Sequence, residues 1–458
     1  MVNINDSFEL SPPLTTKEPQ AETKPSFLKG EALDRYLAKI AENFAAIGLL
    51  RRYNEEWFMF DGTVYHHLLE SAFYHFAYQC AFSDNIILKS AHCRKLLAET
   101  MIRTPASLNA PNDESYTVFS NGIFSNSDGR MISIPSDYFA TISVNGHYLP
   151  QKTLYHPVAD AFLTTISGGN PELIARHWEF WGYILSSDAR AKAIFMLFGA
   201  TGNNGKSTEL TLLSNLLSPG GADTMPLSTM LSRFGIHRIR NCRLEYSGDE
   251  GAMNLNSMQI ALLKAMSGHD GMTADVKNKE MVQFVCTCKI AISSNYNIGM
   301  AYSAVDPAFA RRLRTIPYPV SIPREQQDPY IITRLLEERD AIVTEAFNRY
   351  LELRARNYQF TGSAQFDAAS AILFAPISPG YNAIRTFSEN CCDFSDPNTF
   401  TPTEELYHAF TARYGMLFRD KTGFSQAFHL VNAEKAQKMR RHTGDKNVRG
   451  FYGVRLTV

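Results

Sequence analysis

The 458-residue sequence has few of the features that mark membrane proteins or zinc-stapled and disulfide-stapled domains. No apolar run approaches the roughly 18 consecutive residues that a membrane-spanning helix needs. The seven cysteines include no CxxC pair and no histidine partners at the spacing of a zinc site. Such cysteine usage is typical of a reducing compartment, so we expect a soluble cytoplasmic protein.

The N-terminus lacks the basic start and the apolar stretch of a secretory signal. Pro, Thr, Glu and Lys are frequent in residues 1–25, which predicts a disordered lead-in. The chain as a whole is 45% hydrophobic and 20% charged, values that are ordinary for a globular protein with a sizeable core. At roughly 100–200 residues per domain, its length leaves room for two to four domains.

Net charge is also nearly absent, at −1, which taken alone argues against a nucleic-acid partner. That average conceals a split along the chain. Residues 411–458 contain ten Lys/Arg and only three Asp/Glu, which gives them a net charge of +7 and leaves −8 for the other residues. The sequence therefore places its positive charge in the C-terminal segment.

Residues 26–185 combine helical periodicity with short strand-like runs. The Asp61-Gly62 dipeptide lies between alternating apolar residues and predicts a hairpin with a two-residue turn. A helix over residues 86–103 is expected to flank it. Further turn dipeptides stand at 121–122 and 128–129, and the pattern returns to helix over 156–185.

Residues 186–360 show the pattern of an α/β domain with a mostly parallel sheet. The apolar run IFMLFGA, residues 194–200, predicts a strand that is buried on both faces, and a glycine-rich turn and a helix follow it. Further strands are predicted over 243–247 and 284–293, the second with Cys286 and Cys288 on one face. A helical stretch over 328–357 closes this domain, and residues 375–458 are expected to form a small separate one.

A candidate phosphate-binding loop, GATGNNGKST, runs from Gly199 to Thr208. Small residues let successive backbone N–H groups turn toward a phosphate, while a lysine and a hydroxyl reach the β/γ oxygens and Mg²⁺. The strict pattern requires glycine at position 200, where alanine stands. A glycine-rich turn without a ligand is the alternative, but the strand before it and the helix after it favour nucleotide binding. The candidate binding residues are Gly202, Asn203, Asn204, Gly205, Lys206, Ser207 and Thr208.

An acidic pair, Asp249 and Glu250, ends the predicted strand in CRLEYSGDEGAM, about 45 residues after Lys206. One carboxylate at such a strand end can hold Mg²⁺ while its neighbour polarises the attacking water. A solvated turn is the alternative for two adjacent carboxylates. Glu245, upstream on the same strand, contributes instead if the register differs.

Three further segments follow in the same domain. Asn295 closes the strand that ends in ISSN and is a candidate for orienting water at the γ-phosphate, although Asn is also common in turns. Arg311 and Arg312 precede the apolar strand TIPYPV, and a guanidinium group is suited to neutralising a transferring phosphoryl group across a subunit interface. Lys277 and Lys279 lie between two alternating runs, which predicts a hairpin tip that could touch a phosphate backbone or could be a polar turn.

The segments GNNGKST, SGDE, LLKAMSGHDGMTADVKNKE, ISSN and FARRLRTIPY, in this order, resemble a superfamily 3 helicase. The resemblance is to the primase-helicase type carried by phages, poxviruses, plasmids and integrated elements. It extends to the flanks, where TPTEELYHAFTARYG, FSQAFHLV and GFYGVRL are similar to the family's winged helix. It implies an α/β fold in three parts, which are a mainly helical N-terminal domain over 26–185, an AAA+-like P-loop ATPase core over 186–360 and a winged-helix domain over 375–458.

The resemblance also assigns roles to the candidate residues. Lys206 and Ser207 would bind ATP and Mg²⁺, Asp249 and Glu250 would bind the metal and the attacking water, and Asn295 would be the sensor. Either Arg311 or Arg312 would reach the ATP of the neighbouring subunit. The DNA contacts implied are Lys277 and Lys279 in a central channel and Arg440, Arg441 and Arg449 in the winged helix.

As a whole, the resemblance implies an ATP-dependent replicative DNA helicase of a phage or mobile element, acting in the host-cell cytoplasm. Its partners would be single-stranded and forked DNA, copies of itself in a ring that is usually a hexamer, and a separately encoded primase or polymerase, because about 25 disordered residues cannot contain one. Translocation would run 3′ to 5′. Two alternatives stay open, a replication initiator whose ATPase only switches assembly and a P-loop kinase for a small metabolite.

Overall fold

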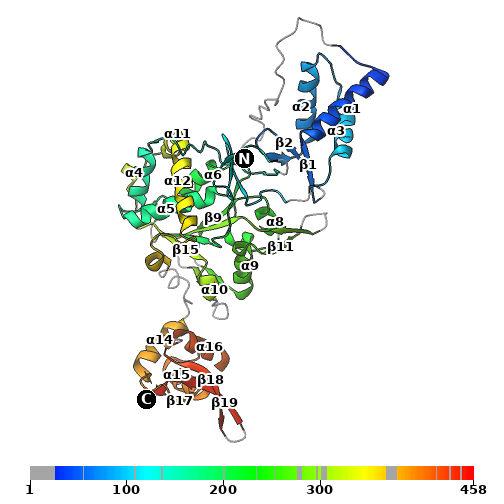
Figure 1. Ribbon diagram of the computed structural model, residues 1–458. Coiled ribbons are helices and arrows are strands. Elements are labelled where there is room, and N and C mark those ends of the chain that lie inside the picture. The colour runs from blue at the N-terminus through cyan, green and yellow to red at the C-terminus, as the bar shows by residue number, and fades with distance from the viewer. Residues whose placement is uncertain are drawn as a thin grey trace.

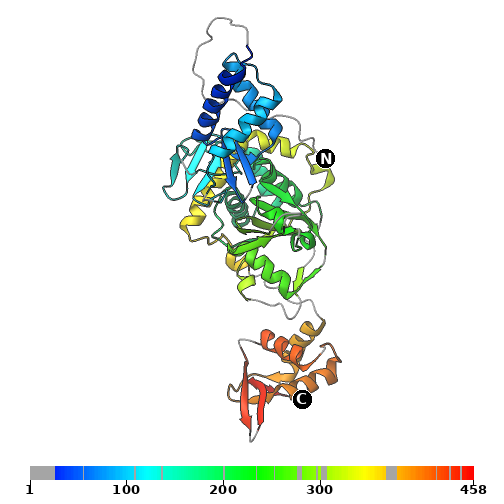
Figure 2. The same ribbon diagram turned by 90° about the vertical axis from the view of Figure 1, so that its right-hand side faces the viewer.

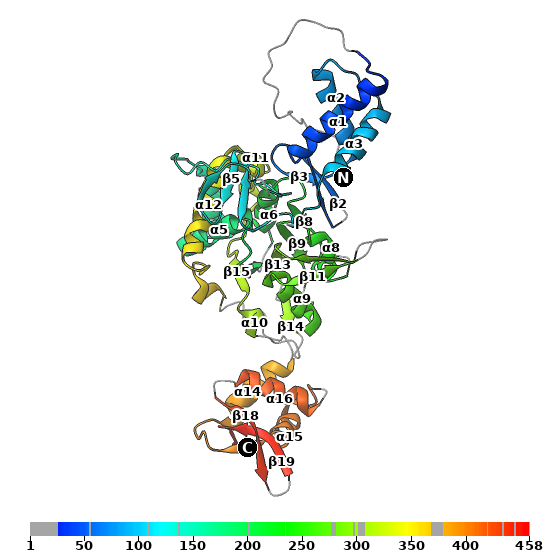
Figure 3. The ribbon, with the colours of Figure 1, turned by 45° about the vertical axis from the view of Figure 1, so that its right-hand side comes forward.

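The computed structural model describes residues 26–457, apart from residues 55, 108–109, 136–137, 200–201, 234, 252, 276–280, 296–297, 301–306, 368–378, 419, 433–434 and 444–445. Figures 1, 2 and 3 show three regions in chain order, with the N-terminal helices at one end, an α/β body in the middle and a C-terminal unit at the other end. None of the helices in the described ranges combines the length and the apolar character of a membrane span.

The first region contains a helical cluster and a small antiparallel sheet. Its elements are α1 (Gly30–Ala46), β1 (Leu50–Tyr53), β2 (Glu56–Phe60), β3 (Tyr65–His67), α2 (Glu70–Ser83) and α3 (Ser90–Arg103). The predicted hairpin is present. The prediction of a two-residue turn is wrong, because Phe60 pairs with Tyr65 and four residues lie between them. Asp61 Oδ1 accepts hydrogen bonds from the backbone of Thr63 and Val64, which stabilises this longer loop.

A second antiparallel sheet and two helices lead into the central domain. The elements are β4 (Tyr116–Phe119), β5 (Gly122–Ser125), β6 (Arg130–Ile132), α4 (Pro157–Ile166) and α5 (Pro171–Leu185). Helix α5 crosses α12 (Arg339–Ala355) so closely that a Cβ on Gly182 would lie 1.9 Å from the backbone oxygen of Ala346. Trp181, Leu197 and Phe347 therefore belong to one hydrophobic core, and the expected boundary between 185 and 186 runs through it.

The central sheet has five parallel strands. Their spatial order is β15 (Leu313–Pro317), β7 (Ile194–Phe198), β13 (Lys289–Ser294), β9 (Leu244–Glu250) and β8 (Ala222–Thr224). Helix α6 (Lys206–Asn215) directly follows the loop after β7. This is the mixed α/β, AAA+-like P-loop core that the sequence predicts, and all five strands end at one edge of the sheet.

The prediction of a single strand over 284–293 is wrong, because parts of two strands occupy this segment. Val282–Val285 forms β12, which pairs with β11 (Gly271–Ala274) in an antiparallel hairpin outside the central sheet. The chain must change direction before β13 begins at Lys289. Cys286 and Cys288 therefore lie buried in the connection between β12 and β13, and not on one strand face as predicted.

Shorter elements complete the central domain. They are α7 (Leu227–Met230), α8 (Gly235–Ile239), β10 (Met253–Leu255), α9 (Ser257–Gly268), β14 (Ile298–Met300), α10 (Pro307–Ala310), a 3₁₀ turn (Arg324–Gln326), α11 (Ile331–Glu337) and a π-helical turn (Ser363–Asp367). The helix predicted over 328–357 is thus divided between α11 and α12, and the helix predicted from 86 begins at Ser90.

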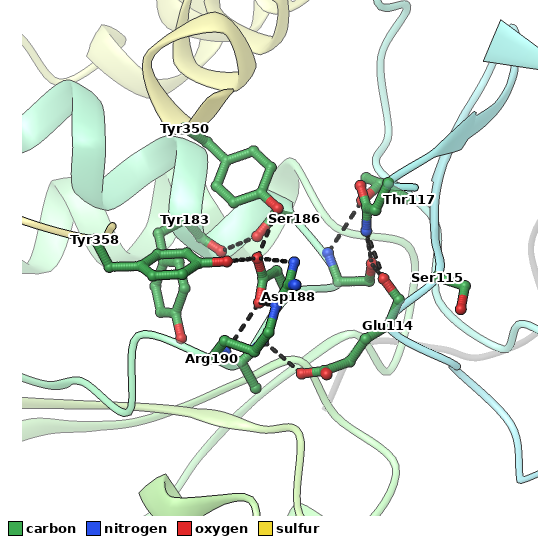
Figure 4. Close-up of polar contacts among 12 residues, drawn as sticks. Glu114, Ser115, Thr117, Tyr183, Ser186, Asp188, Arg190, Tyr350 and Tyr358 are labelled. Carbon is green, nitrogen blue, oxygen red and sulfur yellow. Dashed lines mark hydrogen bonds and ion pairs between the residues drawn. The ribbon is translucent and has the colours of Figure 1, made fainter. Parts of the chain in front are cut away.

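A buried carboxylate fixes the chain just before β7. Asp188 accepts hydrogen bonds from Arg190, from Tyr350 of α12 at 2.8 Å and from Tyr358 (Figure 4). Burial opposes ionisation, but these donors hold the pKa of Asp188 at about 2. Glu114, from the loop before β4, accepts a hydrogen bond from the backbone N–H of Ala189 (Figure 4). The cluster links α12 and the loop before β4 to the segment that leads into β7.

The C-terminal unit contains three helices and short antiparallel strands. These are α14 (Pro379–Cys391), β16 (Cys392–Asp393), β17 (Phe400–Pro402), α15 (Thr403–Tyr414), α16 (Lys421–Val431), β18 (Gln437–Thr443), β19 (Lys446–Tyr452) and β20 (Arg455–Leu456). Its own apolar core includes Phe387, Phe410 and Phe428. Helices followed by a hairpin of β18 and β19 give the winged-helix arrangement, and the hairpin is the wing (Figure 1).

Candidate phosphate site and its surroundings

The candidate phosphate loop, residues 199–208, leaves the central sheet at the end of β7 and enters α6 at Gly205. Gly205 has a φ of 91°, and a Cβ there would lie 2.5 Å from Ile166 Cγ2. Only glycine combines that left-handed backbone with so close a contact. Asn203 also has a positive φ, 55°, which asparagine tolerates better than most residues. The local sequence therefore specifies the loop conformation at two positions.

Lys206 and Asn295, which are 89 residues apart in the sequence, meet at this loop. The Lys206 side chain is 5% exposed, and its Nζ donates to Asn204 Oδ1 at 2.9 Å and to Asn295 Oδ1 at 2.7 Å. Strand β13 runs beside β7, so the residue after Ser294 lies next to the loop. The structure thus brings together the candidate phosphate-binding lysine and the candidate sensor.

Strand β9, which carries Asp249 and Glu250, ends at the same edge of the sheet as β7 and β13. Glu250 lies opposite Ser294, whose hydroxyl donates to the Glu250 backbone oxygen at 2.7 Å. The Glu250 carboxylate accepts a hydrogen bond from the backbone N–H of Leu227, the first residue of α7, at 2.5 Å. Asp249 lies in β9 one residue earlier, and its side chain is outside the described part of the structure.

Glu245 lies at the opposite end of β9 and does not reach this edge. It pairs with Ile290 near the start of β13 and is fully buried. Burial, followed by the nearby charge of Asp223, raises the pKa of Glu245 to about 8. The structure therefore offers no support for the register in which Glu245 replaces the acidic pair.

The chemistry of the donors at the sheet edge suits Mg²⁺. Ser207 is exposed at the start of α6, and β9 ends in carboxylates. Hydroxyl and carboxylate oxygens are the ligands that Mg²⁺ prefers, usually alongside water and phosphate oxygens. No group of three His, Cys, Asp or Glu side chains is placed to bind a metal by itself within the described ranges.

Arg311 and Arg312, the two candidates for an arginine finger that reaches a neighbouring subunit, lie at the opposite edge of the sheet, where the strands begin. Strand β15 begins at Leu313, opposite Ile194, and ends at Pro317, opposite Phe198. Arg311 and Arg312 precede this strand, so they are separated from the phosphate loop of their own chain by a strand length of about 16 Å. Arg311 is exposed, whereas Arg312 donates from its guanidinium group to the backbone oxygen of Lys264 in α9.

The β11–β12 hairpin lies next to the same end of β13 as these arginines, since only residues 286–288 separate β12 from β13. Its four-residue strands pair from Gly271 with Val285 to Ala274 with Val282. The predicted hairpin is therefore confirmed. Lys277 and Lys279, the candidate DNA contacts at its tip, fall on residues 276–280 and lie outside the described residues.

The wing carries the three other candidate DNA contacts. Arg440 of β18 lies directly opposite Arg449 of β19, and both arginines and Arg441 are exposed. Burial together with the charge of Arg449 lowers the pKa of Lys438 on the same hairpin. Like charges opposite each other on two strands repel. The wing is thus a basic surface that a bound anion would stabilise.

Sequence reasoning missed a buried polar cluster behind the phosphate loop. Glu209 of α6 is fully buried, and its carboxylate accepts hydrogen bonds from Trp181 Nε1 and from the hydroxyl of Tyr318. His177 Nδ1 lies 2.8 Å from the same carboxylate. The available signal was a glutamate one residue before Leu210, in the first turn of the helix that follows the loop.

Comparison with known proteins gives a fold and one partial family match. A family of unknown function (DUF5906) matches residues 197–312, from β7 through the two arginines. No curated protein matches the chain. Two solved apo structures of the NrS-1 C-terminal region are similar, with TM-scores of 0.53 and 0.54 at 12% and 13% identity. Each alignment covers 91% of this chain, together with 99% and 98% of the other. This chain therefore has the fold of the NrS-1 C-terminal region.

Proposed function

We propose that this chain is an ATP-dependent DNA translocase of the superfamily 3 helicase type, encoded by a phage or mobile element. The observation that carries the proposal is the contact between Lys206 and Asn295 at the carboxyl edge of the parallel sheet. Nucleotide hydrolysis uses a lysine to bind the phosphates and a polar side chain to orient the attacking water, so both groups belong close to the γ-phosphate.

The remaining residues at that edge would complete the ATPase. Backbone N–H groups from Gly202 to Thr208 would surround the phosphates, and Ser207 and Asp249 would hold Mg²⁺, which supplies positive charge to the β and γ oxygens. Glu250 would polarise the attacking water. Its carboxylate is bound to the backbone of Leu227, so hydrolysis would require Glu250 to share or release that hydrogen bond.

The position of the arginines supports hydrolysis at a subunit interface. Arg311 and Arg312 are about one strand length away from the phosphate loop of their own chain, which fits a role at the ATP of a neighbour. Of the two, Arg311 is exposed, whereas Arg312 is bound to the Lys264 carbonyl. We therefore favour Arg311 as the finger, in a homo-oligomeric ring that is expected to be a hexamer.

DNA would be held at two places. The tip of the β11–β12 hairpin, with Lys277 and Lys279, would contact the strand in the channel, and Arg440, Arg441 and Arg449 of the wing would contact phosphates of the fork. Backbone contacts of this kind carry little sequence information, so binding should depend strongly on salt and weakly on sequence. The 3′ to 5′ polarity and a separately encoded primase or polymerase remain part of the proposal.

A forked-duplex unwinding assay with ATP and Mg²⁺ tests this function. We expect strand separation by the wild-type chain and none by Lys206→Ala or Arg311→Ala. ATP-dependent DNA binding without strand separation would contradict the helicase and favour a replication initiator that uses ATP for assembly. A monomer whose ATP turnover ignores single-stranded DNA would favour a small-molecule kinase.

A further inference from the structure

The surroundings of the Lys206 side chain include one aromatic ring that no candidate role explains. The ammonium of Lys206 lies 5.8 Å from the centroid of the Tyr318 ring, within the range of a cation–π interaction. The two amide oxygens of Asn204 and Asn295 bind the same ammonium. Tyr318 is the first residue after β15, and its backbone N–H donates to the Phe198 oxygen at 2.7 Å.

Tyr318 is held in place at both ends. Near its backbone, a Cβ on Gly199 would lie 3.1 Å from Tyr318 Cβ, so the tyrosine packs directly on the start of the phosphate loop. At the tip of the ring, the hydroxyl donates to Glu209 Oε2. The ring of His177 lies against that of Tyr318, with centroids 5.3 Å apart and planes at 79°.

Glu209 connects this ring to two other elements. It stands three residues after Lys206, in the first turn of α6, and the other oxygen of its carboxylate faces His177 and Trp181 of α5. A fully buried carboxylate is stable only when donors surround it, and here donors from α5 and from the end of β15 do so. The carboxylate therefore fixes the ring relative to the helix that carries the lysine.

We propose that Tyr318 is a positioning residue, which Glu209 anchors and which holds the Lys206 ammonium toward the bound phosphates. This inference rests on the proposed ATPase function and adds to it a residue outside the phosphate loop. In the absence of the ring, the lysine would retain its charge but would occupy more rotamers, so ordering it on nucleotide binding would cost more. Tyr318 itself would not touch ATP.

The test is a double-mutant cycle on nucleotide affinity, measured with a fluorescent non-hydrolysable ATP analogue and Mg²⁺ on the full chain. We expect Tyr318→Leu to weaken binding about tenfold, as the loss of a desolvated cation–π contact implies. Lys206→Ala should weaken it further. The double variant should bind no more weakly than Lys206→Ala, because without the lysine there is nothing for the ring to position.

Two further variants separate positioning from folding. Tyr318→Phe keeps the ring but removes its bond to Glu209, and we expect a smaller loss of affinity. Tyr350→Phe is the matched control, because it removes another buried tyrosine hydroxyl from a carboxylate, that of Asp188, and should leave nucleotide affinity unchanged.

Additive losses in the double variant, or equal losses for Tyr318→Phe and Tyr350→Phe, would overturn the proposal. Wild-type affinity in Tyr318→Leu would do so as well. If the wild-type chain itself fails to bind the analogue, the proposed ATPase function is wrong, and that outcome is distinct from additivity in a protein that binds.

Discussion

Lys206 Nζ donates a hydrogen bond to Asn295 Oδ1 at 2.7 Å, and so joins the phosphate loop to the end of the neighbouring strand. The proposed sensor thus contacts the proposed phosphate-binding group directly. Because the proposed role of Asn295 is to orient the attacking water, a change at Asn295 should act on the chemical step more than on ATP binding.

We expect Asn295→Ala to lower the kcat for ATP hydrolysis by about a hundredfold, the usual effect of removing one well-placed polar group from a reacting centre. The KM should change little, since the phosphate loop remains intact. Steady-state ATPase assays measure both quantities. Asn398→Ala, at an exposed turn of the C-terminal unit, is the control. A rise in KM at constant kcat would show that Asn295 only assists binding.

The arginine arrangement predicts complementation between inactive variants. Lys206→Ala and Arg311→Ala should each lower ATP turnover about a thousandfold or more, because one lacks the phosphate lysine and the other lacks the finger. Mixing them should restore part of the activity, since some interfaces then combine an intact loop with an intact arginine. The ATPase rate of the mixture as a function of its composition is the measurement.

Arg312→Ala in the same mixing experiment decides between the two arginines. Its side chain binds the backbone of Lys264 in α9 within its own chain, so we expect weaker complementation with Lys206→Ala than Arg311→Ala shows. The assignment of Arg311 fails if Arg312→Ala complements Lys206→Ala and Arg311→Ala retains normal turnover.

The facing arginines of the wing predict opposite effects on DNA binding and on stability. Arg440→Ala should weaken binding to forked DNA and reduce the slope of log affinity against log salt by about one. It should also raise thermal stability slightly, because the like charge directly opposite Arg449 is then removed. Fluorescence anisotropy at several salt concentrations and thermal unfolding measure these effects. Arg455→Ala, on an arginine paired with Asp393 at 2.9 Å, should leave the salt slope unchanged.

The buried Glu245 predicts a dependence of stability on pH. Its pKa is about 8 in the folded chain and near its ordinary value of 4.5 in the unfolded chain. Between these values the folded state binds more protons, so the contribution of Glu245 is fully present below pH 4.5 and is lost as the pH rises through 8.

We therefore expect the stability advantage of Glu245→Gln over the wild-type chain to grow from about pH 5 to pH 8 and then to level off. Urea unfolding of both proteins across this range measures the difference, and effects of other titrating groups cancel in it. A difference that is independent of pH would show that Glu245 ionises normally in the folded chain.

Much of this architecture could be predicted because local patterns determine it. The apolar run before Gly199 identified β7, and the polar residues that end two later strands met at one edge because parallel strands share their direction. The break between Val285 and Lys289 could not be predicted, because periodicity does not reveal that β12 pairs with β11 and leaves the sheet. Nor could the Glu209 and Tyr318 pair, since 109 residues separate them.

The edge at which the strands of the central sheet begin and the edge at which they end carry different groups. The loop that would need an arginine lies at one edge, and the arginines lie at the other, about a strand length away. In a head-to-tail contact, the arginines of each copy would lie at the loop of the next copy. Such contacts either close into a ring or continue as a filament. The direction of the strands in each chain would then set the direction of the whole assembly along DNA.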